Sequence, residues 1–234
     1  MKIKAIQKLT LLDFPKHSAA TIFTEGCNLR CPFCHNSSLV VDKDDTYVTE
    51  DEVLELLEKR RGLLDGLAIT GGEPLLQPDI KKFIKKVKDI GFKVKLDTNG
   101  TFPEKLKEIL DDKLVDYVAV DIKSSKDNYG KAVGIPGIAI EKFEKTVEIL
   151  KNSGVPYEFR TTIVKGLHEI SDIEEICKWI GEEAPYFLQM YVDSGDILAN
   201  RDGECGLSAF SHPEAEEILK AAQQIKPNTQ IRGL

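Results

Sequence analysis

Three cysteines lie close together in the segment GCNLRCPFCHN, at the spacing C-x3-C-x2-C. They are Cys27, Cys31 and Cys34, and thiolates this close are ligands for zinc or for an iron–sulfur cluster. A structural zinc ion needs four ligands, and Cys205 is the alternative that could supply the fourth. A [4Fe-4S] cluster held by three thiolates leaves one iron open to bind a substrate or cofactor. We therefore favour such a cluster, and we expect Cys177, in a predicted amphipathic helix, to belong to the core.

The elements that must position this loop alternate along the chain. Buried β-branched runs predict strands, and apolar residues at helical spacing predict helices, one of which begins with a Thr49–Glu52 capping box. Such alternation predicts an α/β fold with a parallel sheet and right-handed crossovers. Six units are fewer than the eight of a closed barrel, so we predict an open, partial (β/α)6 TIM barrel, with a flat, doubly wound sheet as the alternative. The predicted strands are 19–24, 66–70, 92–98, 115–123, 155–164 and 186–192, and the predicted helices are 49–62, 77–91, 103–113, 139–154, 171–184 and 212–225.

Polar, glycine-rich or thiol-bearing residues lie at or after the end of every predicted strand except the fifth, which carries Arg160 within it. In chain order they are the three cysteines, TGGEP (70–74), DTNG (97–100), DIK (121–123), Arg160 and YVDSGD (191–196). Because the carboxyl ends of parallel strands meet at one edge of the sheet, these residues should face one another. The sequence therefore predicts that a single ligand could contact most of them.

The composition predicts a single soluble domain. The chain has 234 residues, of which 41% are hydrophobic and 30% charged, and a net charge of −7, which argues against a nucleic-acid surface. We expect an N-terminal extension (1–17), a core (18–195) and a C-terminal helix and tail (196–234). No apolar run is long enough for a membrane span and no secretory signal is visible, so we expect a cytoplasmic protein. The basic run Lys81–Asp89 predicts a solvated helix face, with a docking face for an acidic partner as the alternative.

The motifs CNLRCPFC, GGEP, DTNG and VDIK, in this order on successive strand ends, resemble those of radical S-adenosylmethionine (SAM) enzymes over most of the chain. Within that superfamily, LTLLDFP followed by TEGCNLRCPFCHN is most similar to the activating enzymes of glycyl radical enzymes. The nearest type is the activating protein of anaerobic ribonucleotide reductase, which is related to pyruvate formate-lyase activating enzyme. The resemblance implies a radical SAM core, a [4Fe-4S] cluster on the three cysteines and SAM on its open iron. Reductive cleavage of SAM would give methionine and a 5'-deoxyadenosyl radical.

The resemblance also implies which residues contact SAM. Phe33 would lie beside the adenine, the GGEP turn would bind the amino group, and Lys123 and Arg160 would bind the carboxylate. Each has a structural alternative: Phe33 could pack the loop, GGEP could be a tight turn, and the two cations could form ion pairs. The implied set is Phe33, Gly71, Gly72, Glu73, Pro74, Asp97, Asn99, Lys123 and Arg160.

The resemblance further implies a possible monovalent-cation site. Asp97, Thr98 and Asp121 match the positions of hard oxygen ligands in the related activating enzymes. Asp97 could also accept hydrogen bonds from ribose hydroxyls. The alternative for the segment TNG is a plain turn, since Asn-Gly favours one.

Two departures refine these expectations. Val192 stands where the pyruvate formate-lyase type has a histidine near SAM, and neither Tyr191 nor Asp193 can be assumed to replace it. The segment 37–51 is too short for the additional clusters of some relatives and has no cysteine, so we expect one cluster.

Hydrogen abstraction by a carbon radical needs no acid or base, so we nominate no catalytic acid or base. His168 and His212 are expected to be surface or capping residues.

Three functions are weighed. The first is an activase that forms a glycyl radical on a partner enzyme, with anaerobic ribonucleotide reductase as the expected partner and a flavodoxin or ferredoxin as electron donor. The second is a radical SAM enzyme for a small molecule, such as 7-carboxy-7-deazaguanine synthase. The third is a non-enzymatic iron–sulfur or zinc module, which the ordered motifs disfavour.

Overall fold

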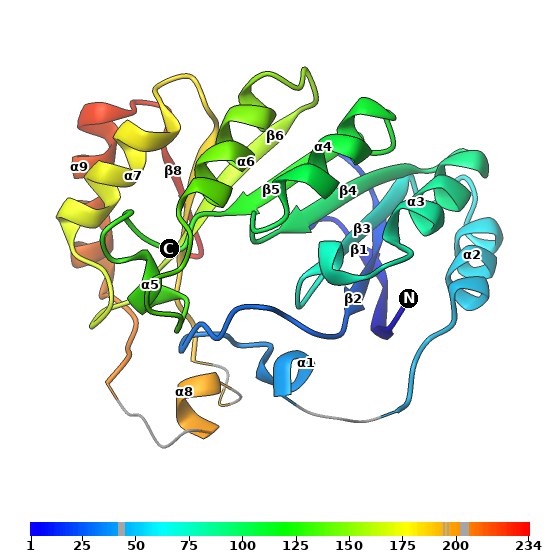
Figure 1. The fold of residues 1–234 in the computed structure, drawn as a ribbon, viewed down its shortest axis with the longest axis horizontal. Coiled ribbons are helices and arrows are strands. Elements are labelled where there is room, and N and C mark those ends of the chain that lie inside the picture. The colour runs from blue at the N-terminus through cyan, green and yellow to red at the C-terminus, as the bar shows by residue number, and fades with distance from the viewer. Residues whose placement is uncertain (42–44, 194, 196, 202–205) are drawn as a thin grey trace.

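A computed structural model describes residues 1–41, 45–193, 195, 197–201 and 206–234. These residues form one eight-stranded sheet whose strands lie side by side in chain order (Figure 1). The first pair, β1 with β2, is antiparallel and the other six pairs are parallel. The strands are β1 (Ile3–Thr10), β2 (Ala19–Thr24), β3 (Gly66–Gly71), β4 (Lys93–Thr98), β5 (Tyr117–Asp121), β6 (Tyr157–Ile163), β7 (Tyr186–Met190) and β8 (Gln230–Arg232).

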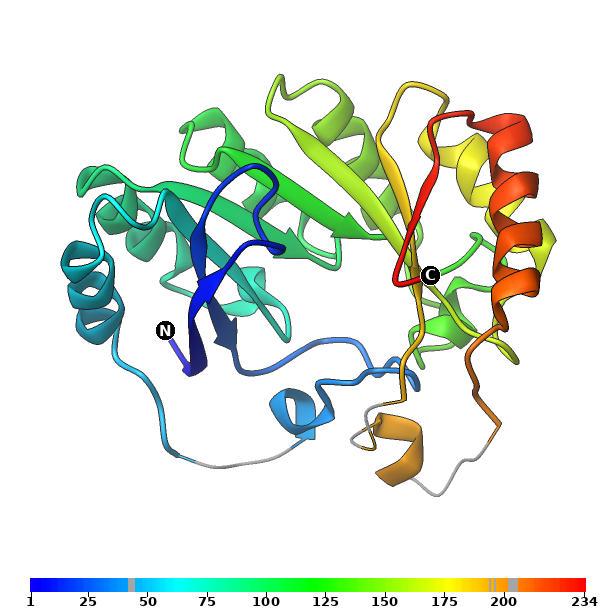
Figure 2. The ribbon, with the colours of Figure 1, turned by 180° about the vertical axis from the view of Figure 1, so that it is seen from behind.

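The strand order decides between the two predicted architectures. A doubly wound sheet reverses its strand order at a switch point, whereas here every parallel crossover moves to the next strand in the same direction. The sheet is curved and open, with β1 (blue) and β8 (red) as its two edges (Figure 2). The predicted α/β fold with an open, partial barrel is confirmed, and the flat doubly wound alternative is wrong.

The long helices form the outer layer of this partial barrel (Figures 1 and 2). On strand β4, alternate residues such as Val94 and Leu96 are apolar and buried, while the residue between them is polar. The helices are α1 (Ser37–Val41), α2 (Glu50–Lys59), α3 (Ile80–Asp89), α4 (Pro103–Asp111), α5 (Tyr129–Ala132), α6 (Glu141–Lys151), α7 (Ile170–Ile180), α8 (Leu198–Arg201) and α9 (His212–Ile225), with a 3-10 turn η1 (Pro74–Leu76).

Two strands were missed by the sequence prediction. The strand β1 lies in the segment expected to be an N-terminal extension, and β8 follows the last predicted helix. Most side chains of β1 are exposed or half-buried and β8 has three residues, so neither shows the buried apolar run that marks the other strands. Both terminal segments thus add edge strands to the same sheet.

Two local predictions about helices are confirmed. Thr49 and Glu52 form the capping box: the Thr49 amide donates to Glu52 Oε2 at 2.8 Å, and the Glu52 amide donates to Thr49 Oγ1 at 3.2 Å. The basic run forms α3, which buries its apolar face, including Phe83, while Lys81 and Lys86 pair at the surface with acidic side chains of other elements. Within the described residues, no helix is both long and apolar enough to span a bilayer.

Candidate functional site

A cavity of about 310 Å³ lies inside the partial barrel, and strands β2 to β7 all contribute to its wall. The cysteine loop, Val40 of α1 and Leu198 of α8 line it as well. The residues that sequence reasoning placed on one rim are thereby brought together. Those on the wall are Cys27, Cys31, Phe33, Cys34, Gly71, Gly72, Pro74, Asp97, Thr98, Asn99, Asp121, Lys123 and Arg160.

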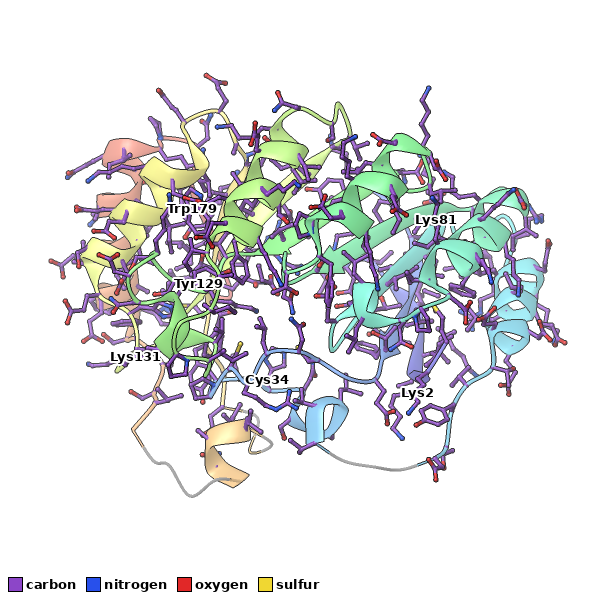
Figure 3. The ribbon with its side chains drawn as sticks, viewed as in Figure 1. Lys2, Cys34, Lys81, Tyr129, Lys131 and Trp179 are labelled. Carbon is purple, nitrogen blue, oxygen red and sulfur yellow. The ribbon has the colours of Figure 1, made fainter. Side chains whose placement is uncertain are left out.

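The cysteine loop connects β2 to α1 and is held in place from several sides. Figure 3 shows Cys34 on this loop, close to α8. Four backbone hydrogen bonds tie the loop to the turn after β3, to the end of α5 and to the start of α8. They are Glu73 N to Gly26 O (2.8 Å), Arg30 N to Val133 O (2.9 Å), Leu198 N to Cys34 O (3.1 Å) and Ala199 N to Pro32 O (2.9 Å).

The three thiols fit the donor set that an iron–sulfur cluster requires, since all are free and all face the cavity. Burial raises the pKa of Cys31 to about 12, although the nearby Lys123 ammonium acts in the opposite direction. Burial likewise raises the pKa of Cys27. Within the described residues, no three His, Cys, Asp or Glu side chains gather around one point as a single ion requires. The alternative ligand Cys205 lies outside the described residues.

The Gly-Gly turn after β3 is fixed by its close approach to the cysteine loop. A Cβ atom on Gly71 would lie 2.3 Å from the Thr24 amide nitrogen, and one on Gly72 would lie 2.1 Å from the carbonyl oxygen of Gly26. Gly71 also has a φ of +117°, which favours glycine. The structure therefore supplies a reason for both glycines that does not depend on a ligand.

Glu73 is placed differently from the expectation of direct SAM contact. Its side chain is fully buried and does not line the cavity. Oε1 accepts hydrogen bonds from the Leu75 amide (2.9 Å) and the Thr98 hydroxyl (2.8 Å), and Oε2 accepts one from the Asn99 amide (2.7 Å). Burial raises the pKa of Glu73 to about 7, against these three hydrogen bonds, which lower it. The carboxylate joins the turn after β3 to the end of β4.

Asn99 joins the end of β4 to the cysteine loop. Its Nδ2 donates to Asn28 Oδ1 at 3.0 Å and lies 3.7 Å from Cys27 Sγ. Its Oδ1 accepts from the hydroxyl of Thr101 at 2.6 Å, and Thr101 accepts in turn from Asn28 Nδ2 at 2.9 Å. Sequence reasoning missed Asn28 and Thr101, although both flank residues that it had selected.

Opposite charges alternate across the ends of β4 and β5 and the middle of β6. Arg160 Nε donates to Asp121 Oδ1 at 2.9 Å, and both terminal nitrogens of Arg160 lie 3.2 Å from Asp97 Oδ2. Lys123 Nζ donates to Asp121 Oδ2 at 3.1 Å, and Lys95 pairs with Asp97. Burial raises the pKa of Asp121, but Arg160 and Lys123 lower it further, so that its pKa lies below the usual range. Both cations expected to bind SAM thus also form the ion pairs considered as their alternative.

Phe33 lies between two side chains of the site. It is buried, the Lys123 ammonium is 5.8 Å from its ring centroid, and the ring of His168 meets it edge-on at 6.2 Å. The loop-packing alternative for Phe33 is therefore compatible with its position on the cavity wall.

His168 is a buried residue, and the expectation of a surface or capping role was wrong for it. Its Nδ1 accepts from the Val164 amide at 3.1 Å, and its Nε2 lies 2.7 Å from the Lys123 carbonyl oxygen. These partners assign a neutral ring with the proton on Nε2. The imidazole therefore joins the loop after β5 to the loop after β6, and no motif in the sequence marks this role. His212, the first residue of α9, is exposed as expected.

The neutral state of His168 predicts a pH dependence of stability. Burial lowers the pKa of His168 from its usual 6.5, against the hydrogen bond to Lys123, which raises it. The unfolded chain therefore binds this proton at a higher pH than the folded chain does. As the pH falls below about 6.5, the free energy of unfolding decreases. In urea unfolding between pH 8 and 5.5, the loss of unfolding free energy should be smaller for His168→Gln than for the wild type. Equal losses in the two proteins would contradict this assignment.

None of the described residues directly after β7 (191–193) lines the cavity. Val192 and Asp193 are exposed, and Tyr191 is buried but does not line the cavity. From this part of the sheet, Gln189 of β7 and Thr162 of β6 reach the cavity wall. Sequence reasoning missed both, although strand alternation from Arg160 points to Thr162.

The fold and site define an α/β protein with an open, partial barrel and an internal cavity that is bordered by a three-cysteine loop. Residues 21–180, more than half of the chain, match the family described as the radical SAM superfamily. The chain belongs to this superfamily and is a radical SAM enzyme. Membership implies a [4Fe-4S] cluster and SAM, with which Cys27, Cys31 and Cys34 are consistent.

Two known enzymes are similar to this chain in sequence, and one solved structure is similar to it in fold. A provisionally named glycyl-radical enzyme activating enzyme of Methanocaldococcus jannaschii is 36% identical over 193 residues, which are 81% of this chain and 79% of the relative. The pyruvate formate-lyase-activating enzyme of Clostridium pasteurianum is 32% identical over 171 residues, 71% of this chain and 70% of that enzyme. The crystal structure of Streptococcus suis SuiB bound to the precursor peptide SuiA is similar in fold, with a TM-score of 0.70 at 15% identity. That match covers 91% of this chain, which spans about half (48%) of SuiB.

Proposed function

We propose that this protein is an activase that forms a glycyl radical on a partner enzyme, and that the partner is an anaerobic ribonucleotide reductase. The observation that carries the first part is the 36% identity with a glycyl-radical enzyme activating enzyme over most of both chains. The segments LTLLDFP and TEGCNLRCPFCHN support the second part, as does Val192 at the position of the histidine of the pyruvate formate-lyase type. A flavodoxin or ferredoxin would supply the electron.

The residues on the cavity wall have distinct roles in this proposal. Cys27, Cys31 and Cys34 would hold the cluster, which when bound supplies the electron that cleaves SAM. Lys123 and Arg160 would bind the SAM carboxylate with those N–H groups that do not bond to Asp97 or Asp121. Only three of the five N–H groups of Arg160 are directed at these carboxylates. The cavity walls would exclude water from the radical.

The hairpin between β1 and β2 supports a macromolecular partner. It carries three exposed leucines, of which Leu11 is 73% and Leu12 is 90% exposed. Large exposed apolar side chains grouped in this way are typical of protein–protein contacts. Gln7 and Asp13, from the same segment, line the cavity. The turn of this hairpin lies at the amino ends of the parallel strands, where Ser18 bonds to Asp65 and His17 contacts Lys93. A partner that covers Leu9, Leu11 and Leu12 would therefore lie at the end of the cavity opposite the cysteine loop.

This contact predicts a selective defect. The double variant Leu11→Ser/Leu12→Ser should lower the yield of glycyl radical on the reductase about tenfold, which corresponds to ~1.4 kcal/mol of lost binding. Cleavage of SAM without the partner should be unchanged, because neither leucine lines the cavity. Leu234→Ser is the control, since Leu234 is 45% exposed but follows β8, at the opposite edge of the sheet. Equal effects of both variants, or none, would contradict the docking role.

Anaerobic reconstitution tests the function as a whole. The protein would be loaded with iron and sulfide, reduced with dithionite and mixed with SAM, and 5'-deoxyadenosine would be measured. A candidate reductase would then be added and its glycyl radical sought by EPR. A radical on the reductase supports the proposal. Release of 5'-deoxyadenosine with a radical on no glycyl radical enzyme, but with turnover of a pterin, would favour the small-molecule function instead.

A further inference from the structure

Each oxygen of the Asp97 and Asp121 carboxylates is already paired with a cationic side chain. Asp97 Oδ1 pairs with Lys95, and Asp97 Oδ2 accepts from both terminal nitrogens of Arg160 at 3.2 Å. Asp121 Oδ1 accepts from Arg160 Nε at 2.9 Å, and Asp121 Oδ2 accepts from Lys123 Nζ at 3.1 Å. All four oxygens therefore face cationic nitrogens.

The third expected ligand, Thr98, also has hydrogen-bond partners within the protein. The Thr98 hydroxyl donates to the buried carboxylate of Glu73 at 2.8 Å, and its oxygen accepts from the Gly100 amide at 3.2 Å. A hard cation needs several oxygens aimed at one point. The residues that resemble a monovalent-cation site thus do not fit such an ion in this protein.

Charge leads to the same result. Three cationic side chains, Lys95, Lys123 and Arg160, pair with the two carboxylates, and their side chains include the nearly buried Lys95 (2% exposed) and Arg160 (13% exposed). A third carboxylate, Glu158, lies 4.0 Å from Arg160 and is itself paired with Arg232. Burial lowers the pKa of Arg160, but Asp121 and Asp97 raise it further, so that the guanidinium stays charged. An additional cation would be repelled by these groups in a poorly solvated place.

We propose that the guanidinium of Arg160 occupies the place of the monovalent cation, so that the protein binds no such ion between Asp97 and Asp121. The planar fork of arginine suits this role because one group can reach both carboxylates, as Nε does to Asp121 and the terminal nitrogens do to Asp97. Removal of Arg160 should therefore create a cation site where the wild type has none.

Thermal unfolding of the purified, anaerobic protein in different salts tests this inference. At constant ionic strength, the melting temperature of the wild type should be the same in sodium, potassium and N-methylglucamine chlorides. Arg160→Gln should melt lower in N-methylglucamine and recover by about 4 °C, saturably, in sodium or potassium. Line broadening of the ²³Na NMR signal should likewise appear only in the variant. Neither measurement depends on SAM cleavage. A failure of this inference can therefore be distinguished from a failure of the proposed function.

Lys88→Gln is the matched control. Lys88 pairs with the partly buried Asp116, at 2.7 and 2.8 Å, and contacts neither Asp97 nor Asp121. It should lose stability without gaining a response to sodium or potassium. Saturable stabilisation of the wild type by either ion would overturn the inference, and so would an Arg160→Gln protein that is equally destabilised in all salts. If Arg160→Gln does not fold, the wild-type series and Arg160→Lys, expected to be independent of the ion, decide the question.

Discussion

Replacing Cys31 with serine should leave a folded protein that assembles no intact cluster and cleaves SAM roughly 1,000-fold more slowly or not at all, because the cofactor supplies the electron. Cys31 is the most buried of the three loop cysteines and faces the cavity. A serine hydroxyl is a poor ligand for iron in a site that requires thiolates. The measurements are the absorbance and EPR spectra of the reconstituted protein and the release of 5'-deoxyadenosine.

Cys177 provides the control for this prediction. It is a free cysteine buried in α7 and does not line the cavity. Cys177→Ser also buries a hydroxyl, at a cost of about 1–3 kcal/mol, and should keep its cluster and its SAM cleavage. If Cys177→Ser lost the cluster and Cys31→Ser kept it, the assignment of the ligands would be wrong.

Replacing Gly72 with alanine should have the second large effect. The new methyl group would lie 2.1 Å from the carbonyl oxygen of Gly26, which is much shorter than a contact between two non-bonded atoms. Relief of the overlap would break the hydrogen bond from the Glu73 amide to that carbonyl, which ties the turn to the cysteine loop. We expect a loss of about 3 kcal/mol in the free energy of unfolding and poor assembly of the cluster. Urea unfolding and the iron content after reconstitution measure the two effects.

Gly206→Ala tests whether the effect comes from the overlap. A Cβ atom on Gly206 would meet no other atom within 4 Å, and neither Gly206 nor Gly72 has a positive φ. The control should therefore change the free energy of unfolding little. Similar losses for the two variants would show that the close approach to Gly26 is not the cause.

The central strands of the fold could be predicted because they are buried on both faces. The run AATIFT of β2 is apolar and β-branched, a pattern that is typical of a strand inside a parallel sheet. The edge strands gave no such signal, since β1 exposes side chains such as Ala5 and Leu9. The pairing of β1 depends on the direction of β2, and the pairing of β8 depends on β7, which lies far away in the chain. A local sequence pattern contains neither piece of information.

The site could be predicted as far as its residues belong to motifs. The cysteines, the Gly-Gly turn and the charged strand ends are contiguous in sequence, and parallel strands bring them to one cavity. The hydrogen-bond partners that position them could not be predicted in the same way. Glu73 belongs to a motif but turns away from the cavity, and His168 comes from a loop with no recognisable pattern. Whether a polar side chain faces a ligand or a neighbouring loop depends on rotamers and distances between elements.

The bonds from the start of α8 to the cysteine loop have a consequence for biogenesis. On the ribosome, Pro32 and Cys34 emerge early, whereas Leu198 and Ala199, whose amides donate to their carbonyls, emerge only after β7 has been made. For most of translation, the three thiols therefore lack the segment that closes over their loop. The cysteine loop can therefore adopt its final conformation only late in synthesis, when the start of α8 is available to bond to it.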